Sequence, residues 1–294
     1  MKVIPRIRGG LGNQLFAYAA ARRIALINNA ELIIDNVSGF KYDHTYQQQY
    51  HLDHFNIKAS LASPQDRFEP FSRLRRYLKR RVNQRIPFEQ RHYIQQQGNA
   101  FDPRLLTLKL HGDLYLEGYW QSERYFQDIE DVIRTDLKIK PPSDTDNLRV
   151  SEQIRCCDAI ALHVRFFDDP KEVSNNNATG EYYARALAAM RARAPAAHYF
   201  LFSDNVNAAR ALIGLADNQL TVVSHNQSDA TACADLWLMT QCKHFIIANS
   251  TFSWWGAWLS AHKDKVVIAP GFVLQGSKTA WGFDGLLPEG WIKI

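Results

Sequence analysis

Cysteine is scarce in this sequence of 294 residues. There are four cysteines: Cys156, Cys157, Cys233 and Cys242. Neither their number nor their spacing makes a disulfide framework or a Cys-x-x-Cys metal site. The sequence therefore excludes the small disulfide-stapled folds, and a reducing, cytoplasmic location fits it.

Long apolar runs are also missing. The stretch 244–262 lacks Asp, Glu, Lys and Arg, but it contains Asn249 and Ser250, and such polar groups are not expected in a lipid-spanning helix. Near the amino terminus, Pro5 and Arg6 fall where a secretion signal would need an unbroken apolar segment. We expect neither a membrane span nor a secretion signal.

Metal-binding and common hydrolase motifs are absent too. One Asp-x-Asp occurs, at 144–146 in a polar run, and the ten histidines form no His-x-x-x-His pair. There is no Gly-x-Ser-x-Gly elbow and no Walker loop. We expect no metal and no cofactor.

What the sequence does contain is typical of a soluble globular protein, with 46% hydrophobic and 22% charged residues. In its second half, apolar runs predict strands at Ala159 to Val164, His198 to Ser203, Leu220 to Val223, Phe245 to Ala248 and Val266 to Ala269. Helical periodicity fills the gaps at 182–193, 205–215, 230–242 and 253–261. This alternation predicts an α/β domain with a parallel, doubly wound sheet.

The first half begins in the same way. We expect a strand at Lys2 to Arg8, a glycine-rich turn, a helix at about 13–28 and a strand at 31–35. Pro5 is awkward in such a strand because proline donates no ladder hydrogen bond. The polar run 140–147 is the expected linker. The predicted domains are therefore residues 1–147 and 148–294.

Basic residues are not spread evenly. The chain has 35 Lys and Arg against 30 Asp and Glu, and the segment from Arg73 to Arg85 holds seven basic residues and no acidic one. Subtracting those seven charges from the net +5 leaves −2 for the rest. Leu74, Tyr77, Leu78 and Val82 recur within this segment at helical spacing.

This pattern predicts a basic amphipathic helix with two open interpretations. The helix lies on an anionic membrane surface, or it docks onto its own protein by the apolar stripe and leaves its arginines in water. Nucleic acid is not expected as a partner, since the segment lacks interleaved aromatics and matches no nucleic-acid-binding signature.

The glycine-rich turn reads Gly9-Gly10-Leu11-Gly12-Asn13-Gln14 between a strand and a helix. Glycines there let the backbone approach a ligand, and the free N–H groups of a helix start attract phosphate. Asp35 follows Gly12 at a distance suited to a dinucleotide-binding fold, but Leu15 occupies the third glycine position. An NAD(P)-dependent oxidoreductase is therefore one alternative, and a merely tight turn is another.

Three predicted strand ends carry polar side chains. His163 and Arg165 lie on one side of an extended segment, where an arginine can neutralise a departing pyrophosphate. Asp204 follows the next strand, although an Asp or Asn there is also an ordinary helix cap. Asn249 to Ser253 form a third such strand end, ahead of a tryptophan-rich helix that we assign to packing.

Asp235 lies in a predicted helix among apolar neighbours. A guanine edge, with two adjacent N–H donors, would satisfy such a carboxylate, and so would solvent.

Five segments together resemble the bacterial α-1,2-fucosyltransferases, glycosyltransferase family 11. They are GGLGNQLF at 9–16, LEGYWQSERYF at 116–126, HVRFFD at 163–168, FSDN at 202–205 and NSTFSWWGAWL at 249–259. The resemblance implies a GT-B-like fold of two Rossmann-type domains facing a cleft, with acceptor binding on the N-terminal side. It also implies metal-independent, inverting transfer of L-fucose from GDP-β-L-fucose to the 2-hydroxyl of a terminal galactose in a free or lipid-linked glycan, as in O-antigen biosynthesis.

The resemblance also implies roles for residues. Arg165 would hold the pyrophosphate with His163 nearby, and Asp235 would face guanine. The remaining donor-binding residues would be Gly10, Gly12, Asn13, Gln14, Asp204, Asn249, Ser250, Thr251, Phe252 and Ser253. In place of the family's second consecutive arginine this chain has Phe166, which leaves that arginine's role without a residue.

The catalytic base stays open. Asp168, Asp169, Glu172 and Glu181 are candidates by their proximity to Arg165 in sequence, and Asp168 is preferred. The donor phosphate could take the proton instead. A non-catalytic nucleotide- or glycan-binding module is the further alternative, suggested by the tryptophan-rich C-terminal half. We expect the protein in the cytoplasm, in peripheral contact with the inner membrane through the basic helix.

Overall fold

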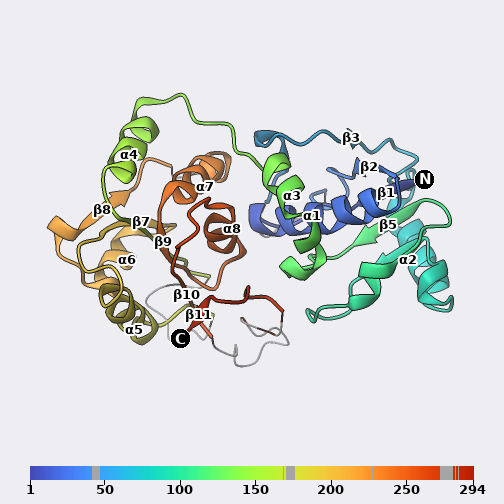
Figure 1. Cartoon of the computed structure of the whole chain (residues 1–294). Helices are drawn as coiled ribbons and strands as arrows, with labels where there is room; N and C mark the ends of the chain where they lie inside the picture. The colour runs from blue at the N-terminus through green and yellow to red at the C-terminus, as the bar shows by residue number, and fades with distance from the viewer. Residues whose placement is uncertain are drawn as a thin grey trace. The chain divides into compact units, whose positions relative to one another are not determined.

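The computed structural model describes residues 1–41, 47–167, 169, 176–226, 228–271, 281, 283 and 285–294. The chain forms two compact units. The first contains Met1–Lys138 and a short C-terminal segment at 285–286, and the second begins at Ile139 and includes the carboxyl terminus. Each unit contains a parallel sheet with helices packed on it (Figure 1).

The sheet of the first unit has the strand order β3-β2-β1-β5-β4, and all its pairs are parallel. Its strands are β1 (Lys2–Pro5), β2 (Glu31–Ile34), β3 (Ser60–Leu61), β4 (Tyr93–Gln95) and β5 (Leu114–Glu117). The helices are α1 (Leu11–Ile27), α2 (Ser72–Asn83) and α3 (Glu130–Asp136). Helix α1 packs on β1 and β2, whereas α2 packs on the edge strand β4.

Strand β1 ends at Pro5, three residues before the predicted end at Arg8. The missing N–H of proline is tolerated at the end of the strand, where the ladder stops. The Pro5 carbonyl still accepts from the Asp35 backbone N–H at 3.0 Å, and the Arg6 N–H donates to the Leu116 carbonyl at 2.9 Å. These bonds bring Arg6, Asp35 and β5 together at the carboxyl edge of the sheet.

The sheet of the second unit has the order β11-β10-β9-β6-β7-β8 and is also parallel. Its strands are β6 (Ala159–Val164), β7 (His198–Ser203), β8 (Leu220–Val223), β9 (His244–Ile246), β10 (Val267–Ala269) and β11 (Ile292–Lys293). Its helices are α4 (Thr145–Arg155), α5 (Gly180–Arg191), α6 (Val206–Ile213), α7 (Ala232–Gln241) and α8 (Thr251–Leu259). The five strands and four helices predicted for this half are all present, with boundaries shifted by up to two residues.

The boundary between the units differs from the predicted one. The units divide between Lys138 and Ile139, whereas the linker was expected at 140–147. Thr145 opens α4, because the Asp144 side chain accepts from the Asn147 backbone N–H at 2.9 Å and caps the helix. A polar run that looked like a linker is therefore in part a helix start.

The predicted α/β class with two parallel-sheet units is confirmed. Of the helices in the described ranges, none combines the length and the apolar character that crossing a bilayer demands.

Candidate functional site

Arg165 and Asp204 form an ion pair at the carboxyl edge of the second sheet. Arg165 follows β6 and Asp204 follows β7, and Arg165 Nη1 lies 3.1 Å from Asp204 Oδ2. The other Asp204 oxygen accepts from the Phe166 backbone N–H at 3.2 Å. Asn205, not Asp204, caps α6 by accepting from the Ala208 N–H. Asp204 is therefore used to orient Arg165, which keeps 43% of its side chain exposed.

His163 lies on β6, two residues before Arg165, and its side chain is buried. Its ring centroid is 5.7 Å from that of Phe252, and its Nδ1 has no hydrogen-bond partner among the described residues. Burial, together with a smaller effect of the Arg165 charge, lowers the pKa of His163 to about 3. The imidazole is thus neutral near pH 7, and its free nitrogen suits a hydrogen bond to a ligand.

Four residues separate the end of β9 at Ile246 from the start of α8 at Thr251. The Ser250 hydroxyl accepts from the Phe252 N–H at 3.3 Å, and the buried Ser253 hydroxyl donates to the Ser250 carbonyl at 3.2 Å. Asn249 donates to the Asn176 carbonyl at 2.7 Å, but its buried Oδ1 has no partner in the described part of the chain. Thr251 and Phe252 are half-buried. The helix start thus presents hydroxyls, backbone N–H groups and one unsatisfied oxygen.

The tryptophans of α8 are core residues, as predicted. Trp254 and Trp255 are fully buried, and Trp258 is 4% exposed. The rings of Trp254 and Trp258 are stacked with centroids 6.2 Å apart. Packing of this size holds the start of α8 rigidly at the sheet edge.

Asp235 lies in the first turn of α7, and its carboxylate accepts from the Asn226 amide at 2.7 Å. Burial outweighs the Asn226 hydrogen bond, which lowers the pKa, so that the pKa of Asp235 is raised to about 7. The folded protein therefore keeps a proton that the unfolded chain releases. As the pH rises from the ordinary carboxyl value of 3.8 towards 7, this group lowers the free energy of unfolding. Such a cost is typical of a group retained for binding.

The glycine-rich turn of the first unit is held by Gln14. Gly9 has a φ of +74°, and a Cβ there would lie 3.1 to 3.3 Å from Asn13 and Tyr119. The fully buried Gln14 amide donates to the Gly9 and Gln49 carbonyls and accepts from the His51 N–H. The Gln14 amide nitrogen therefore donates within the protein, and no N–H of this side chain is free for the predicted contact with the sugar donor. Asn13 accepts from the Gln121 amide at 2.7 Å. Gly10 is the N-cap of α1, and Gly12 lies in its first turn.

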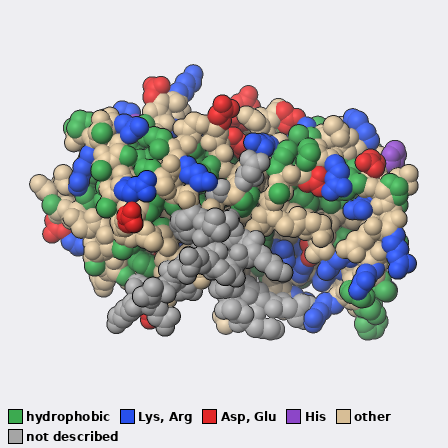
Figure 2. Space-filling model, turned by 90° about the horizontal axis from the view of Figure 1, so that it is seen from below, with side chains coloured by type: hydrophobic (Ala, Val, Ile, Leu, Met, Phe, Trp, Pro, Cys, Tyr) green, Lys and Arg blue, Asp and Glu red, His purple; other side chains and the backbone are tan. Residues whose placement is uncertain are grey.

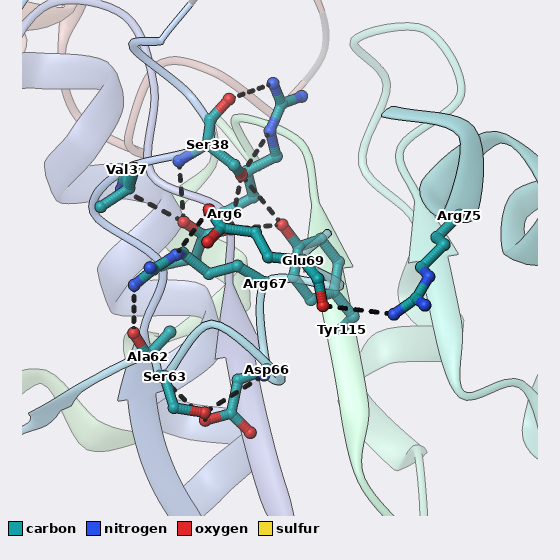
Figure 3. A network of polar contacts seen from close by, with 11 residues as sticks. Arg6, Val37, Ser38, Ala62, Ser63, Asp66, Arg67, Glu69, Arg75 and Tyr115 are labelled. Atoms are coloured by element: carbon teal, nitrogen blue, oxygen red, sulfur yellow. Dashed lines mark hydrogen bonds and ion pairs between the residues drawn. The ribbon is translucent and has the colours of Figure 1, made fainter. Parts of the chain in front are cut away.

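Asp35 is fully buried and engaged. One carboxylate oxygen accepts from the Val37 and Ser38 backbone N–H groups, and the other accepts from the hydroxyls of Ser38 and Tyr115. Of these partners, Val37, Ser38 and Tyr115 are labelled in Figure 3. The ribose contact required by the oxidoreductase alternative has no place here, because the carboxylate is sealed and saturated.

A second buried network surrounds Glu117 at the end of β5, and sequence reasoning missed it. Arg6 Nη1 lies 2.6 Å from Glu117 Oε1, Arg80 Nη2 lies 3.5 Å from Oε2, and the Tyr93 hydroxyl donates to Oε2. Burial would raise the pKa of Glu117, but the Tyr93 bond and the two guanidinium charges outweigh it and lower the pKa. The one signal was a glutamate that ends an apolar run.

Of the four candidate bases, the structure describes two. Asp168 and Glu172 lie outside the described residues. Asp169 and Glu181 are exposed, and Glu181 is in the first turn of α5. Phe166, at the position of the missing arginine, packs against the hydrophobic core of the second unit. That position therefore supplies packing in this chain.

Known proteins match this chain over nearly its whole length. The model of glycosyl transferase family 11 matches residues 2–281. An alpha-1,2-colitosyltransferase from Escherichia coli is 27% identical over 312 residues, covering 99% of this chain and 98% of that protein. The O-antigen biosynthesis glycosyltransferase WbnK from Escherichia coli is 24% identical over 307 residues, covering 98% of this chain and 99% of its own.

Solved structures share the fold. Fucosyltransferase NodZ from Bradyrhizobium has a TM-score of 0.50 at 16% identity, covering 87% of this chain and 91% of its own. A variant of Arabidopsis thaliana FUT1 in complex with GDP has a TM-score of 0.53 at 13% identity, covering 90% of this chain and 69% of its own. The predicted GT-B-like class is confirmed.

Proposed function

Because the chain belongs to glycosyl transferase family 11, we propose that this glycosyltransferase moves L-fucose from GDP-β-L-fucose to the 2-hydroxyl of a terminal galactose, with inversion and without a metal. The observation that carries the proposal is the group of polar side chains at the carboxyl edge of the second sheet. In open α/β sheets ligands bind at this edge. The acceptor is an oligosaccharide of the O-antigen type, which the likeness to WbnK supports.

In this proposal Arg165 supplies the positive charge that a bound metal ion supplies in metal-dependent enzymes. The acceptor 2-hydroxyl oxygen bonds to fucose C1 as the bond between C1 and the β-phosphate oxygen breaks, and the pyrophosphate gains negative charge. The hydroxyl proton passes to a carboxylate or to the departing phosphate. The Arg165 guanidinium, oriented by Asp204, neutralises it, and the N–H groups at the start of α8 add further donors. The neutral His163 ring and Asn249 Oδ1 each offer the donor a free hydrogen-bonding atom.

The acceptor side of the proposal rests on the first unit. A cavity of about 330 Å³ there is lined by Tyr77, Arg80, Arg81, Gln84 and the three glutamines at 95–97. Amide and guanidinium groups suit the hydroxyls of a sugar, which both donate and accept. The oxygen of Gln96 accepts from the backbone N–H groups of Tyr119 and Trp120, which fixes the wall of the cavity.

Ligand stabilisation in EDTA tests the donor. GDP or GDP-fucose at 100 times its dissociation constant is expected to add about 2.7 kcal/mol of apparent stability, a rise in Tm of about 5 to 10 °C. UDP and NAD are expected to give none. A shift with NAD alone, or sustained failure to transfer fucose to a galactose-terminated acceptor, would contradict the proposal. EDTA-sensitive transfer would contradict its metal independence.

Colitose is the second candidate, because a relative of this chain is an alpha-1,2-colitosyltransferase. Colitose is fucose without its 3-hydroxyl, so both sugars fit one reaction scheme. The ratio of kcat/KM for GDP-fucose and GDP-colitose decides between them. If GDP-colitose is preferred by more than about tenfold, colitose replaces fucose in the proposal.

The role proposed for Asp235 predicts a pH dependence. A carboxylate accepts from both N–H donors of guanine only when it is ionised, and with a pKa of about 7 the ionised fraction rises from about one tenth to about nine tenths between pH 6 and 8. GDP is therefore expected to bind up to about tenfold more tightly at pH 8 than at pH 6.

In Asp235→Asn this pH dependence should vanish and binding should weaken at pH 8, as measured by calorimetric titration. Asp229→Asn, an exposed carboxylate just before α7, is the matched control and should behave as wild type. An unchanged slope in Asp235→Asn would contradict the guanine contact.

A further inference from the structure

Helix α2 exposes its apolar side chains, whereas an ordinary surface helix turns them towards the core. Its exposed side chains include the apolar ones: Leu74 (58% exposed), Tyr77 (48%), Leu78 (52%) and Val82 (59%). Phe71, directly before the helix, is 76% exposed. The interpretation in which the helix docks onto its own protein by this stripe is therefore wrong. Figure 2 shows hydrophobic side chains beside Lys and Arg side chains at the lower right, on the side where Figure 1 places α2.

Polar contacts seat the opposite face of α2. Arg76 and Asn83 are buried, and with the partly buried Arg80 they recur at helical spacing. The Asn83 side-chain oxygen accepts from the His92 and Tyr93 backbone N–H groups at 2.8 and 3.0 Å. Arg80 reaches Glu117. Turning the apolar stripe inward would break these hydrogen bonds and separate Arg80 from Glu117, which would leave the buried Glu117 with one charge partner fewer. These contacts therefore stabilise the orientation in which the stripe faces outward.

The segment leading into α2 is pinned as well. The Arg67 guanidinium donates to the Ala62 carbonyl, and Arg75 donates to the Glu69 carbonyl at 3.2 Å (Figure 3). Asp66 accepts from the Ser63 hydroxyl and lies 3.1 Å from Lys2 Nζ. These contacts fix the angle at which the helix and Phe71 leave the unit.

Charge accompanies the apolar stripe. Arg73, Arg75, Lys79, Arg81 and Arg85 are exposed, and no acidic residue lies between Arg73 and Arg85. A helix with an apolar face and a cationic border lies in the interface of an anionic bilayer, where the side chains enter the headgroup boundary and the cations meet lipid phosphates. We propose that the exposed face of α2, with Phe71, docks this protein onto anionic lipid surfaces.

A second copy of the chain fits this face less well. In a two-fold dimer the same patch meets itself, so the cationic borders would face one another without a carboxylate between them. A lipid surface supplies the missing negative charge and an apolar layer together. The proposal does not depend on the sugar donor, because lipid binding is measured without substrate.

Vesicle co-sedimentation of the full chain tests the proposal. Wild type is expected to bind vesicles of equal parts phosphatidylglycerol and phosphatidylcholine at least tenfold more tightly than pure phosphatidylcholine vesicles, with salt weakening the binding. Arg73→Gln with Arg85→Gln removes two exposed charges and should weaken binding by about tenfold or more. Leu74→Gln with Leu78→Gln should weaken it similarly, since insertion is lost.

Helix α4 provides matched controls. Arg149→Gln with Arg155→Gln removes two exposed charges, and Leu148→Gln removes an exposed leucine (41%). Both should bind as wild type, and unchanged thermal unfolding should show that every variant is folded.

Three results would overturn the proposal: no binding to the anionic vesicles, equal losses in the α4 controls, or full binding by the leucine pair. Sedimentation equilibrium that shows a dimer, converted to monomer by the leucine pair, would assign the face to a second copy instead.

Discussion

Arg165→Ala is expected to lower kcat for fucose transfer by about 10²- to 10³-fold with little change in the free energy of unfolding. The guanidinium stabilises charge that develops as the pyrophosphate leaves, and loss of one such electrostatic contact costs about that much in rate. Because the side chain is 43% exposed, its removal disturbs little packing. The measurement is steady-state transfer to a galactose-terminated acceptor, with Tm recorded in parallel.

Two further variants sharpen this test. Arg165→Lys keeps the charge but loses the two-pronged geometry, so we expect an intermediate rate. Arg210→Ala removes another arginine paired with an aspartate in the same unit, Asp217, and should leave kcat unchanged. If Arg165→Ala keeps more than a tenth of the wild-type kcat, Arg165 does not stabilise the leaving group.

Glu117→Gln is expected to destabilise the first unit by about 3 kcal/mol. The substitution leaves Arg6, 15% exposed, and Arg80 without their carboxylate in a partly dry site. Removing one partner of a buried ion pair costs about 3 to 5 kcal/mol, because the remaining charge stays buried. Denaturant unfolding followed by circular dichroism measures the loss.

The matched control is Glu130→Gln, which breaks the more exposed pair with Arg134 and should cost under about 1 kcal/mol. The double variant Arg6→Gln with Glu117→Gln should lose less than the sum of its single changes, since fewer charges remain unpaired. Equal unfolding midpoints for Glu117→Gln and Glu130→Gln would contradict the role given to the network.

Local pattern predicted most of the second unit. The strands β6, β7 and β8 were predicted with their observed ends, because buried parallel strands are continuous apolar runs. The rule that strand ends meet at one edge predicted that Asp204 lies at the same sheet edge as Arg165. The structure adds that the two side chains are 3.1 Å apart.

The first unit was harder to predict. Between Asp35 and Leu114 its strands are two or three residues long, too short for periodicity to register. The Gln14 and Glu117 networks join residues far apart in sequence, 37 positions for Gln14 to His51 and 111 for Arg6 to Glu117. No local signal marks such pairs.

The sequence by itself determined the α/β class, the order of five strands and four helices in the second unit, the motifs at the strand ends and the excess of basic charge from Arg73 to Arg85. Each depends on the composition or spacing of neighbouring residues. The sequence did not predict α4 or β11. The tertiary structure alone decided which way α2 faces, that Asp35 is sealed and that Asp235 is buried enough to raise its pKa. Those properties depend on what surrounds a side chain in space, and burial and partner charges arise only when distant segments pack together.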